Sequence, residues 1–334
     1  MIKKTLHFSN PAYLSLQQNQ LLIDLPHLKV LGEKECKRKI PIEDIGIIIL
    51  DHQQITITHG CMAALLDNNA AIVTCNHTHH PTGMMLPIDG HDIQSERFRY
   101  QIDASQPLKK QLWQQTVQAK ILNQAAVLFD RGIACDNMVY WARSVRSGDP
   151  DNYEGRAAAY YWKHVFHKKV EFFRGRDGDP PNNLLNYGYA ILRAIVARGL
   201  VCSGLLPTLG IHHRNKYNAY CLADDIMEPY RPYVDLIVLG IVDRGENFLE
   251  LGRDIKSQLL GIATVDVQFE RGTSPLMVGM QQTTSSLAKC YEGVVRKINY
   301  PCMRAFDHKR LSVYRDLDDG GVVNDSFTED HSSF

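Results

Sequence analysis

The chain has 334 residues, of which 44% are hydrophobic and 22% charged, and its formal net charge is zero. This composition is typical of one large or two ordinary folded domains and excludes a low-complexity chain. No apolar run approaches the roughly 20 residues that span a bilayer, so no membrane contact is expected. Residues 1–11 lack the apolar core of a signal peptide, and no Cys-x-x-Cys pair occurs. We therefore predict a cytoplasmic protein.

The zero net charge, which argues weakly against a nucleic-acid partner, hides an asymmetry along the chain. Residues 312–334 hold six acidic side chains and one basic side chain. Residues 1–311 consequently have a net charge of +5. The body is thus mildly basic, and we expect the acidic tail, 312–334, to be solvated and disordered.

The first 90 residues contain the short alternating runs that are typical of strands. Residues 13–16 and 21–25 flank the polar segment 17–20 and predict a hairpin. Residues 45–50 form a compact apolar run that fits a buried strand. Further strands are expected at 39–42, 70–74 and 84–86, with one helix at 61–66. Residues 1–90 are therefore predicted to form a small, β-sandwich-like domain.

The pattern changes after Gly90 to helical periodicity. The longest amphipathic helix is expected at 106–129, entered at Pro107. No strand pattern of comparable length follows, so residues 91–311 are predicted to form an all-helical domain, with a hinge at 89–96. The fold class is accordingly α+β and multidomain. Other helices are expected at 138–145, 155–166, 183–200, 222–242 and 278–298.

Glu154, at the start of a predicted helix, has two interpretations. It stands three residues after Asp151, the spacing of a capping box, in which the glutamate bonds back to the start of the helix. Alternatively it is a functional carboxylate. Ala157, Ala158 and Tyr161 share its helical face and look like packing residues. A carboxylate close to a buried face is costly unless it is paired or bound to a cation.

A glycine-rich loop, residues 204–217, carries the adjacent His212 and His213. It runs into a helix on which Asp225 and Glu228, three residues apart, share one face. A histidine just before a helix that presents carboxylates is typical of a site for a hard divalent cation. The sequence therefore offers a second set of candidate ligands.

The alternative for this helix is a plain surface on which Glu228 pairs with Arg231, three residues later. Pro229 argues against it, because a proline removes a helical hydrogen bond and crowds the carbonyl of Asp225. A helix distorted beside its own carboxylates favours a functional site.

A third segment, residues 75–80, holds one cysteine and three histidines. It follows a predicted strand and has no second ligand pair at zinc spacing. We interpret it as a solvated loop rather than as a metal site.

Together these motifs resemble the CRISPR-associated spacer integrase family, the universal endonuclease of CRISPR adaptation. The resemblance covers nearly all of residues 1–305, and the tail beyond departs from the pattern. The double histidine and the run Met-Glu-Pro-Tyr-Arg-Pro are similar to the type II branch, whose members work beside a large RNA-guided effector nuclease. Four motifs in the family's order support it: Glu154-Gly155 with the Ala/Tyr helix, and residues 183–189, 204–213 and 225–232.

Position by position, the resemblance implies that Glu154, His213 and Glu228 are the catalytic metal ligands. Asp225 and His212 correspond to accessory residues. The cofactor implied is Mg²⁺ or Mn²⁺, and a histidine ligand suits Mn²⁺ somewhat better. The reaction implied is transesterification, in which 3′-hydroxyl ends of captured spacer DNA are joined to the CRISPR repeat.

The resemblance also implies partners. The N-terminal β-domain would form a homodimer, and two dimers would clamp a dimer of a small ferredoxin-like protein in a heterohexamer. DNA is the expected substrate, as spacer precursor duplex and as repeat, with Arg146 and Lys216 as candidate phosphate contacts. Two other functions remain open: a stand-alone metal-dependent nuclease acting on branched or single-stranded DNA, and a non-catalytic scaffold that clamps DNA.

Overall fold

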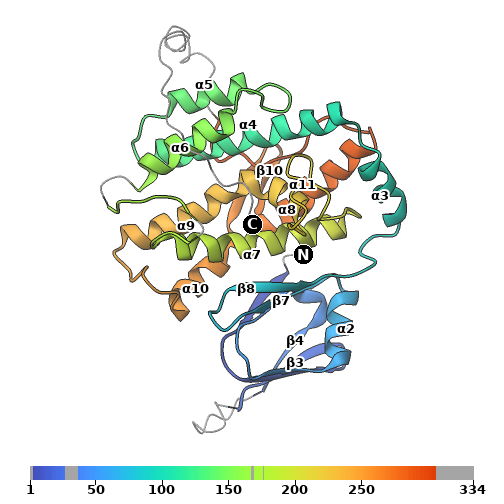
Figure 1. Cartoon of the computed structure of the whole chain (residues 1–334). Helices are drawn as coiled ribbons and strands as arrows, with labels where there is room; N and C mark the ends of the chain where they lie inside the picture. Colours follow the sequence, from blue (N-terminus) through green and yellow to red (C-terminus); the bar gives the residue numbers. More distant parts are fainter. Residues whose placement is uncertain (1–2, 27–36, 167–168, 176, 306–334) are drawn as a thin grey trace.

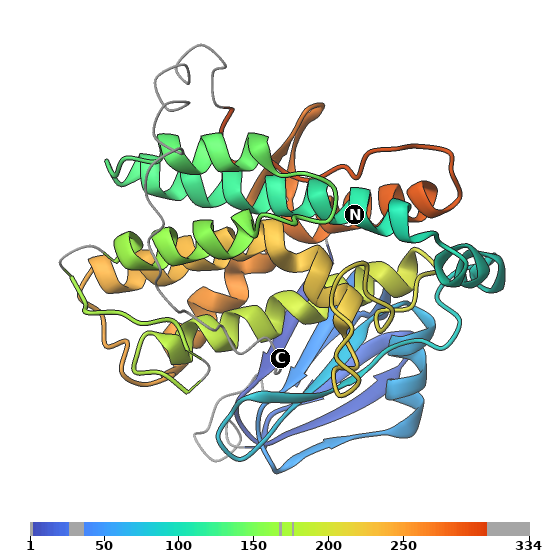
Figure 2. The same cartoon turned by 45° about the horizontal axis from the view of Figure 1, so that its top comes forward.

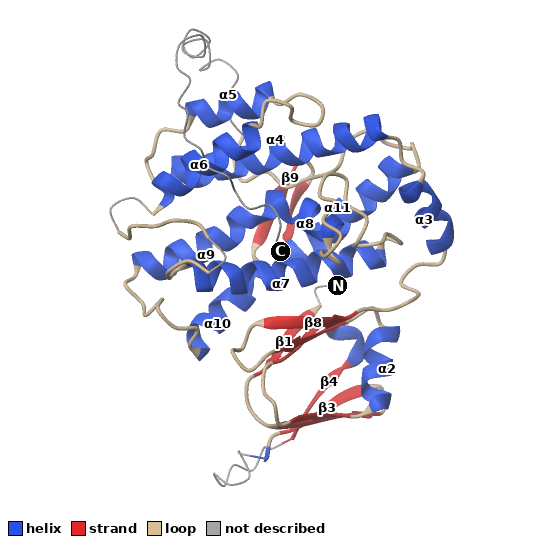
Figure 3. Ribbon diagram, in the orientation of Figure 1, coloured by secondary structure: helices blue, strands red, loops and turns tan. Residues whose placement is uncertain are grey.

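The computed structural model describes residues 3–26, 37–166, 169–175 and 177–305 (Figure 1). The predicted disorder of residues 312–334 falls outside these ranges. Strands gather in the N-terminal part of the chain, and helices stack above them, as the colours of Figure 3 make plain. The chain is thus a mixed α+β protein with a strand-rich N-terminal region and a largely helical C-terminal region, as the sequence predicted.

The N-terminal region contains two four-stranded sheets. The predicted hairpin is confirmed: β2 and β3 pair antiparallel, and Gln18 and Asn19 turn the chain with φ of 51° and 59°. Two short strands, β1 and β6, were not predicted. One sheet has the order β1 (Lys4–Phe8), β5 (Ile45–Leu50), β7 (Ala71–Cys75), β8 (Pro81–Met85), and the other β4 (Lys37–Pro41), β3 (Gln20–Asp24), β2 (Ala12–Gln17), β6 (Ile55–Ile57); a 3-10 turn η1 (Ile42–Asp44) and helix α2 (His59–Asp67) complete the region.

Strand β5 lies between two hydrophobic cores. Ile45 and Ile48 pack in a cluster that both sheets share, together with Leu14 and Leu21. Ile47 and Ile49 face the other way and join the large core of the helical region. A strand that is buried on both faces needs a continuous apolar run rather than an alternating one. This requirement explains why residues 45–50 contain no polar side chain.

The helical region is arranged around α7, which crosses the middle of the molecule between the sheets and α4 (Figures 1 and 2). Most of its side chains are buried, so the apolar run around residues 184–192 is explained by its central position. The elements are α3 (Gln94–Ile102), α4 (Gln106–Asp130), α5 (Asp136–Ser144), α6 (Tyr153–Val165), α7 (Asn182–Cys202), α8 (Cys221–Met227), η2 (Glu228–Tyr230), α9 (Arg231–Asp243), α10 (Arg253–Leu260), η3 (Gly261–Thr264) and α11 (Leu276–Tyr291).

The prediction that this half is all-helical was wrong. A hairpin, β9 (Asp266–Phe269) and β10 (Gly272–Pro275), lies among the helices. Val267 and Phe269 point into the core while their neighbours are exposed. Strands of four residues are too short to give a periodic signal in the sequence. The alternation of buried and exposed residues becomes apparent only when the surrounding helices pack against one side of the hairpin.

Helix α3 begins at Gln94, inside the segment 89–96 that was predicted to be the hinge between the two halves. Arg97 fixes this helix to the body of the helical region. Its guanidinium donates to the Glu292 carboxylate at 2.8 Å and to the carbonyl of Ser203 at 2.9 Å. The segment 89–96 is therefore partly helical and runs into a helix held by an ion pair.

A buried carboxylate connects the two regions. Asp51, which follows β5, accepts from Lys256 Nζ of α10 at 2.8 Å and lies 3.0 Å from His7 Nε2. His79 Nδ1 is 2.8 Å from its other oxygen. Part of the loop at 75–80, predicted to be solvated, thus belongs to an inter-region contact.

Among the described residues, one helix has the length and composition of a membrane span, which corrects the expectation that no apolar run approaches that length. It is α7, with a mean hydropathy of 1.2 over its most apolar window, and 78% of that window is buried inside the protein. A buried core helix of a folded protein has the same length and composition, so this observation by itself is weak evidence for a membrane.

The packing of α7 on α9 depends on Gly188. A Cβ atom at this position would collide with Val234 Cγ1. We expect Gly188→Ala to lower the free energy of unfolding by about 1–3 kcal/mol, because an added methyl group in a filled core forces the helices apart. Urea unfolding measures this change in the free energy of unfolding.

Gly261→Ala is the control, because a Cβ atom at this position meets nothing within 4 Å. Its free energy of unfolding should stay within about 0.5 kcal/mol of wild type. Equal losses in the two variants would contradict the packing argument.

Candidate active site

Glu154 is placed by the cap at the start of α6. The N-cap residue is Asn152, whose side chain accepts from the backbone N–H of Gly155 at 3.2 Å. The Asp149 carboxylate accepts from the N–H groups of Tyr153 and Glu154 at 3.0 and 2.9 Å. These two caps satisfy the first turn, so the Glu154 side chain is not needed there.

The capping-box interpretation of Glu154 was therefore wrong. Asp151 does not cap the helix; its carboxylate forms a two-bond ion pair with Arg146, at 2.8 and 2.9 Å. The Glu154 carboxylate instead reaches the ammonium of Lys120 on α4, at 2.8 Å. Ala157, which shares its helical face, is buried as predicted.

Glu228 lies at the break that Pro229 introduces. The single helix predicted at 222–242 is divided into α8, the 3-10 turn η2 and α9. Glu228 does pair with Arg231, at 2.8 Å, as the alternative reading expected. The carboxylate is only 4% exposed, however, so the pair belongs to the interior and not to a surface helix.

Lys120 joins the two glutamates. Its Nζ lies 2.8 Å from Glu154 Oε1 and 2.7 Å from Glu228 Oε2. Burial by itself raises the pKa of Glu228, but the Arg231 guanidinium and the Lys120 ammonium outweigh it and lower that pKa to about 2. Burial lowers the pKa of Lys120, and the two carboxylates reverse this and raise it above its ordinary value. Glu228 and Lys120 are thus both charged at neutral pH.

Asp225 fixes the glycine-rich loop of residues 204–217, which is called the histidine loop below. Its buried carboxylate accepts from the backbone N–H groups of Ile211 at 2.7 Å, His212 at 3.0 Å and His213 at 3.3 Å, and it also pairs with His213 Nδ1. Gly210 permits this approach, because a Cβ there would meet the His213 carbonyl and the Asp225 carboxylate. Burial lowers the pKa of His213, and the Asp225 carboxylate overrides it and raises that pKa to about 9.

His212 is fixed differently from its neighbour. Its ring stacks on Trp113 of α4, with centroids 4.1 Å apart and planes 5° apart. The His213 ring meets the same tryptophan edge-on at 5.7 Å. The two histidines therefore have separate supports, and stacking sets the position of His212 beside the site.

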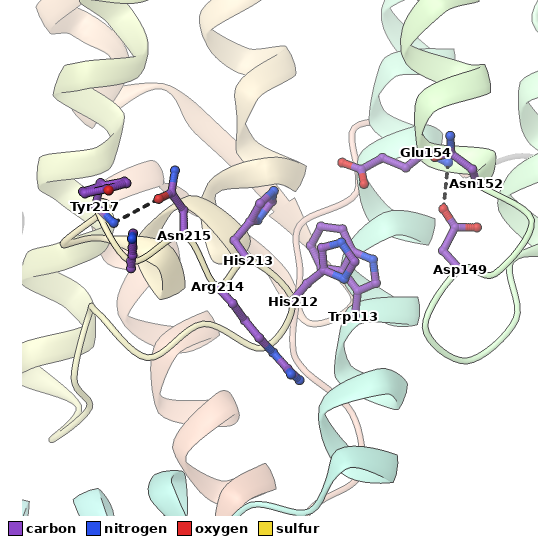
Figure 4. Close-up of a pocket in the computed structure, with 10 residues that line it drawn as sticks. Trp113, Asp149, Asn152, Glu154, His212, His213, Arg214, Asn215 and Tyr217 are labelled. Carbon is purple, nitrogen blue, oxygen red and sulfur yellow. Dashed lines mark hydrogen bonds between the residues drawn. The ribbon is translucent and has the colours of Figure 1, made fainter. Parts of the chain in front are cut away.

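Glu154, His213, His212 and Trp113 line a pocket of about 640 Å³, whereas Lys120, Asp225 and Glu228 are not among its lining residues (Figure 4). In the close-up Glu154 points from α6 toward the loop that carries His213. Lys216 lines the pocket, together with the strongly exposed Tyr217. Arg146 does not line it, and its charge is balanced by Asp151. The complete lining is Trp113, Asp149, Asn152, Glu154, His212, His213, Arg214, Asn215, Lys216 and Tyr217.

The structure brings the predicted residues together, but not as a finished metal site. Within the described ranges, no group of three or more His, Cys, Asp or Glu side chains is arranged to hold a metal ion. Glu154 and Glu228 converge on an ammonium, and His213 Nδ1 is directed to Asp225. Their role as metal ligands stays a prediction.

Sequence reasoning missed Lys120, Trp113 and Asp149. For Lys120 a signal existed: it stands three residues after Val117 and seven after Trp113, so it falls on the buried face of an amphipathic helix. A charged residue on such a face needs a partner. Nothing in the sequence indicated which carboxylates it meets.

Comparisons with known proteins agree on one family. The model of the CRISPR-associated protein Cas1 family matches residues 7–249. The CRISPR-associated endonuclease Cas1 of Neisseria meningitidis serogroup C (strain 8013) is 38% identical over 288 residues, which cover 86% of this chain and 91% of the relative.

Solved structures share the fold. A casposase bound to integration product aligns with a TM-score of 0.74 and 19% identity, covering 94% of this chain and 99% of its own. A Cas6-RT-Cas1–Cas2 complex aligns with a TM-score of 0.69 and 18% identity, covering 91% of this chain and 36% of the matched chain. At these identities the likeness concerns the fold alone.

The pairing of Asp225 with His213 gives a prediction for the metal-free protein. In Asp225→Asn the pKa of His213 should fall from about 9 toward its ordinary value of 6.5, because the neutral amide no longer stabilises the protonated ring. The stabilisation that this pair contributes is complete below the unfolded pKa and is lost as the pH rises through 9. NMR titration of the His213 ring with EDTA present measures the pKa, and urea unfolding over the same pH range measures the stability.

Asp224→Asn is the matched control, since the Asp224 carboxylate accepts from Arg193 and from the side-chain amide of Asn218, each at 2.6 Å, rather than from His213. Its His213 should titrate as in wild type. An unchanged His213 titration in Asp225→Asn would show that Asp225 does not set the charge of this ring.

Proposed function

This chain belongs to the Cas1 family of CRISPR-associated proteins, and from that premise we propose that it is a metal-dependent DNA integrase and endonuclease of CRISPR adaptation. One observation carries the proposal: Glu154 and Glu228 converge on the Lys120 ammonium beside a pocket that Glu154 and His213 line. Two carboxylates converging on one cation, with an imidazole near them, fit a site for Mg²⁺ or Mn²⁺.

Glu154, His213 and Glu228 would hold the divalent cation, and Asp225 would orient His213. A cation bound there would acidify the attacking hydroxyl and neutralise charge on the phosphate. The 3′-hydroxyl oxygen of the captured DNA attacks a phosphorus at the edge of the repeat. One phosphodiester bond forms as another breaks, and the displaced oxygen takes up a proton. With water as the nucleophile the same arrangement gives cleavage.

Arg214 and Lys216 supply positive charge at the pocket, which suits the phosphates of a DNA strand. The Arg214 guanidinium is oriented by Gln106 Oε1, at 2.5 Å. Tyr217, 82% exposed and with Lys216 Nζ 4.8 Å from its ring centroid, offers a face on which a base can stack. These features favour a strand that enters the pocket from the histidine loop.

The proposed partners are DNA and a Cas2 protein. In support, the similar solved structures are a casposase bound to integration product and a complex that contains Cas1 and Cas2. Homodimerisation through residues 1–90, a heterohexamer with a ferredoxin-like partner, contact with a type II effector and a cytoplasmic location all stay predictions.

A strand-transfer assay tests the proposal. Purified protein and its Cas2 partner are mixed with a short duplex that bears 3′-hydroxyls, a supercoiled plasmid that carries the repeat, and Mn²⁺ or Mg²⁺. Wild type should join the duplex to the plasmid. Glu154→Gln, His213→Ala and Glu228→Gln should each lose at least about 100-fold in joining rate, because each removes one ligand.

Glu246→Gln is the matched control, since this exposed carboxylate pairs with Arg244 away from the pocket. It should join at the wild-type rate. Metal-dependent cleavage without joining would replace the integrase by a stand-alone nuclease, and DNA binding without any metal-dependent chemistry would leave a scaffold.

The two candidate phosphate contacts should differ in strength. Lys216→Ala should weaken DNA binding and reduce the slope of log K against log salt by about 1, since one phosphate contact is lost. Arg146→Ala should change the slope less, because Asp151 already neutralises this guanidinium. Fluorescence anisotropy over a salt series, with EDTA present, measures both slopes; equal slopes for the two variants would contradict the assignment.

A further inference from the structure

Lys120 occupies an unusual position for a lysine. Its side chain is 12% exposed and its Nζ lies 2.8 Å from one glutamate and 2.7 Å from the other. The three side chains come from three separate elements, α4, α6 and η2. Without this ammonium, the Glu154 and Glu228 carboxylates would face each other across a buried space and repel.

The charges around Glu228 are already balanced. One carboxylate oxygen meets Lys120 and the other meets Arg231 Nε at 2.8 Å. A divalent cation bound by Glu154 and Glu228 would stand next to the Lys120 ammonium, and like charges at contact distance in a buried site repel strongly. The cation and the ammonium therefore cannot both take this place between the carboxylates.

We propose that Lys120 acts as a built-in substitute for the divalent cation: it holds Glu154 and Glu228 together in the metal-free protein and must withdraw when the cation binds. The inference rests on the proposed function and deepens it, because it makes Lys120 the residue that sets metal affinity. It is a positioning residue, since it acts through the two carboxylates.

The chemistry of lysine suits this role. The ammonium is a compact, strongly hydrated charge on a flexible four-carbon stem, so it can leave without moving the backbone. The Nζ atom lies 2.8 Å from Glu154, which lines the pocket of about 640 Å³, so we expect the displaced ammonium to move toward that pocket. Arg231 is not equivalent: its guanidinium packs over the Tyr189 ring, 4.7 Å from the centroid, which fixes it.

Direct metal binding tests the inference without activity. Mn²⁺ binding to the full-length protein is measured by calorimetry in wild type, Lys120→Met and Lys120→Gln. Both variants should bind Mn²⁺ at least about tenfold more tightly, because the competing charge is gone. Lys256→Met is the control: this lysine is also buried and bound to a carboxylate, Asp51, at 2.8 Å, but lies elsewhere. Its Mn²⁺ affinity should equal that of wild type.

Thermal unfolding supplies a second readout. In EDTA both Lys120 variants should melt below wild type, since the buried Glu228 and the partly buried Glu154 lose their shared partner. A fixed excess of Mn²⁺ should raise their melting temperatures by more than it raises that of wild type, because stabilisation by a ligand grows with the logarithm of its concentration divided by Kd.

The outcomes separate this inference from the function on which it rests. Mn²⁺ affinity that is equal to or weaker than wild type in both Lys120 variants overturns the substitute role. If Glu154→Gln and Glu228→Gln also keep wild-type Mn²⁺ affinity, the proposed metal site itself fails. If those two variants lose Mn²⁺ binding while the Lys120 variants gain nothing, only the role of Lys120 fails.

Discussion

The burial of Glu228 is the constraint around which the helical region is arranged. A buried carboxylate is tolerated only with partners, and here they come from two directions. Lys120 reaches it from α4, and Arg231 follows it by three residues. Lys120 also holds Glu154, so the same ammonium fixes the start of α6 against α4. Three elements far apart in the sequence are thereby joined by charge at one point.

A second buried carboxylate organises the loop beside that point. Asp225 gathers three consecutive backbone N–H groups and one histidine ring, which turns a glycine-rich loop into a fixed wall of the pocket. The cap of α6 follows the same logic, because Asp149 and Asn152 satisfy the first turn and release Glu154. In each case one carboxylate serves the backbone so that another side chain can face the pocket.

Much of the fold was predictable because its signals are local. The apolar periodicity of residues 106–129 predicts α4, and the polar segment 17–20 predicts a hairpin turn. Pro229 predicts a distortion of its helix, which the structure shows as the break between α8 and α9. Other elements left no such signal. Strands β9 and β10 are four residues each. Helix α3 begins inside the segment 89–96 that was predicted to be a hinge, and Arg97 with its partners holds this helix in place.

The sequence by itself determined which side chains are candidates: Glu154, His213 and Glu228 stand in motifs whose order and spacing are recognisable without a structure. Only the tertiary structure decided their partners. It brought Lys120 between the two glutamates, directed His213 to Asp225 and paired Arg146 with Asp151. The physical reason is that a motif records spacing along the chain, whereas the partner of a buried charge is chosen by packing between elements that can be a hundred residues apart.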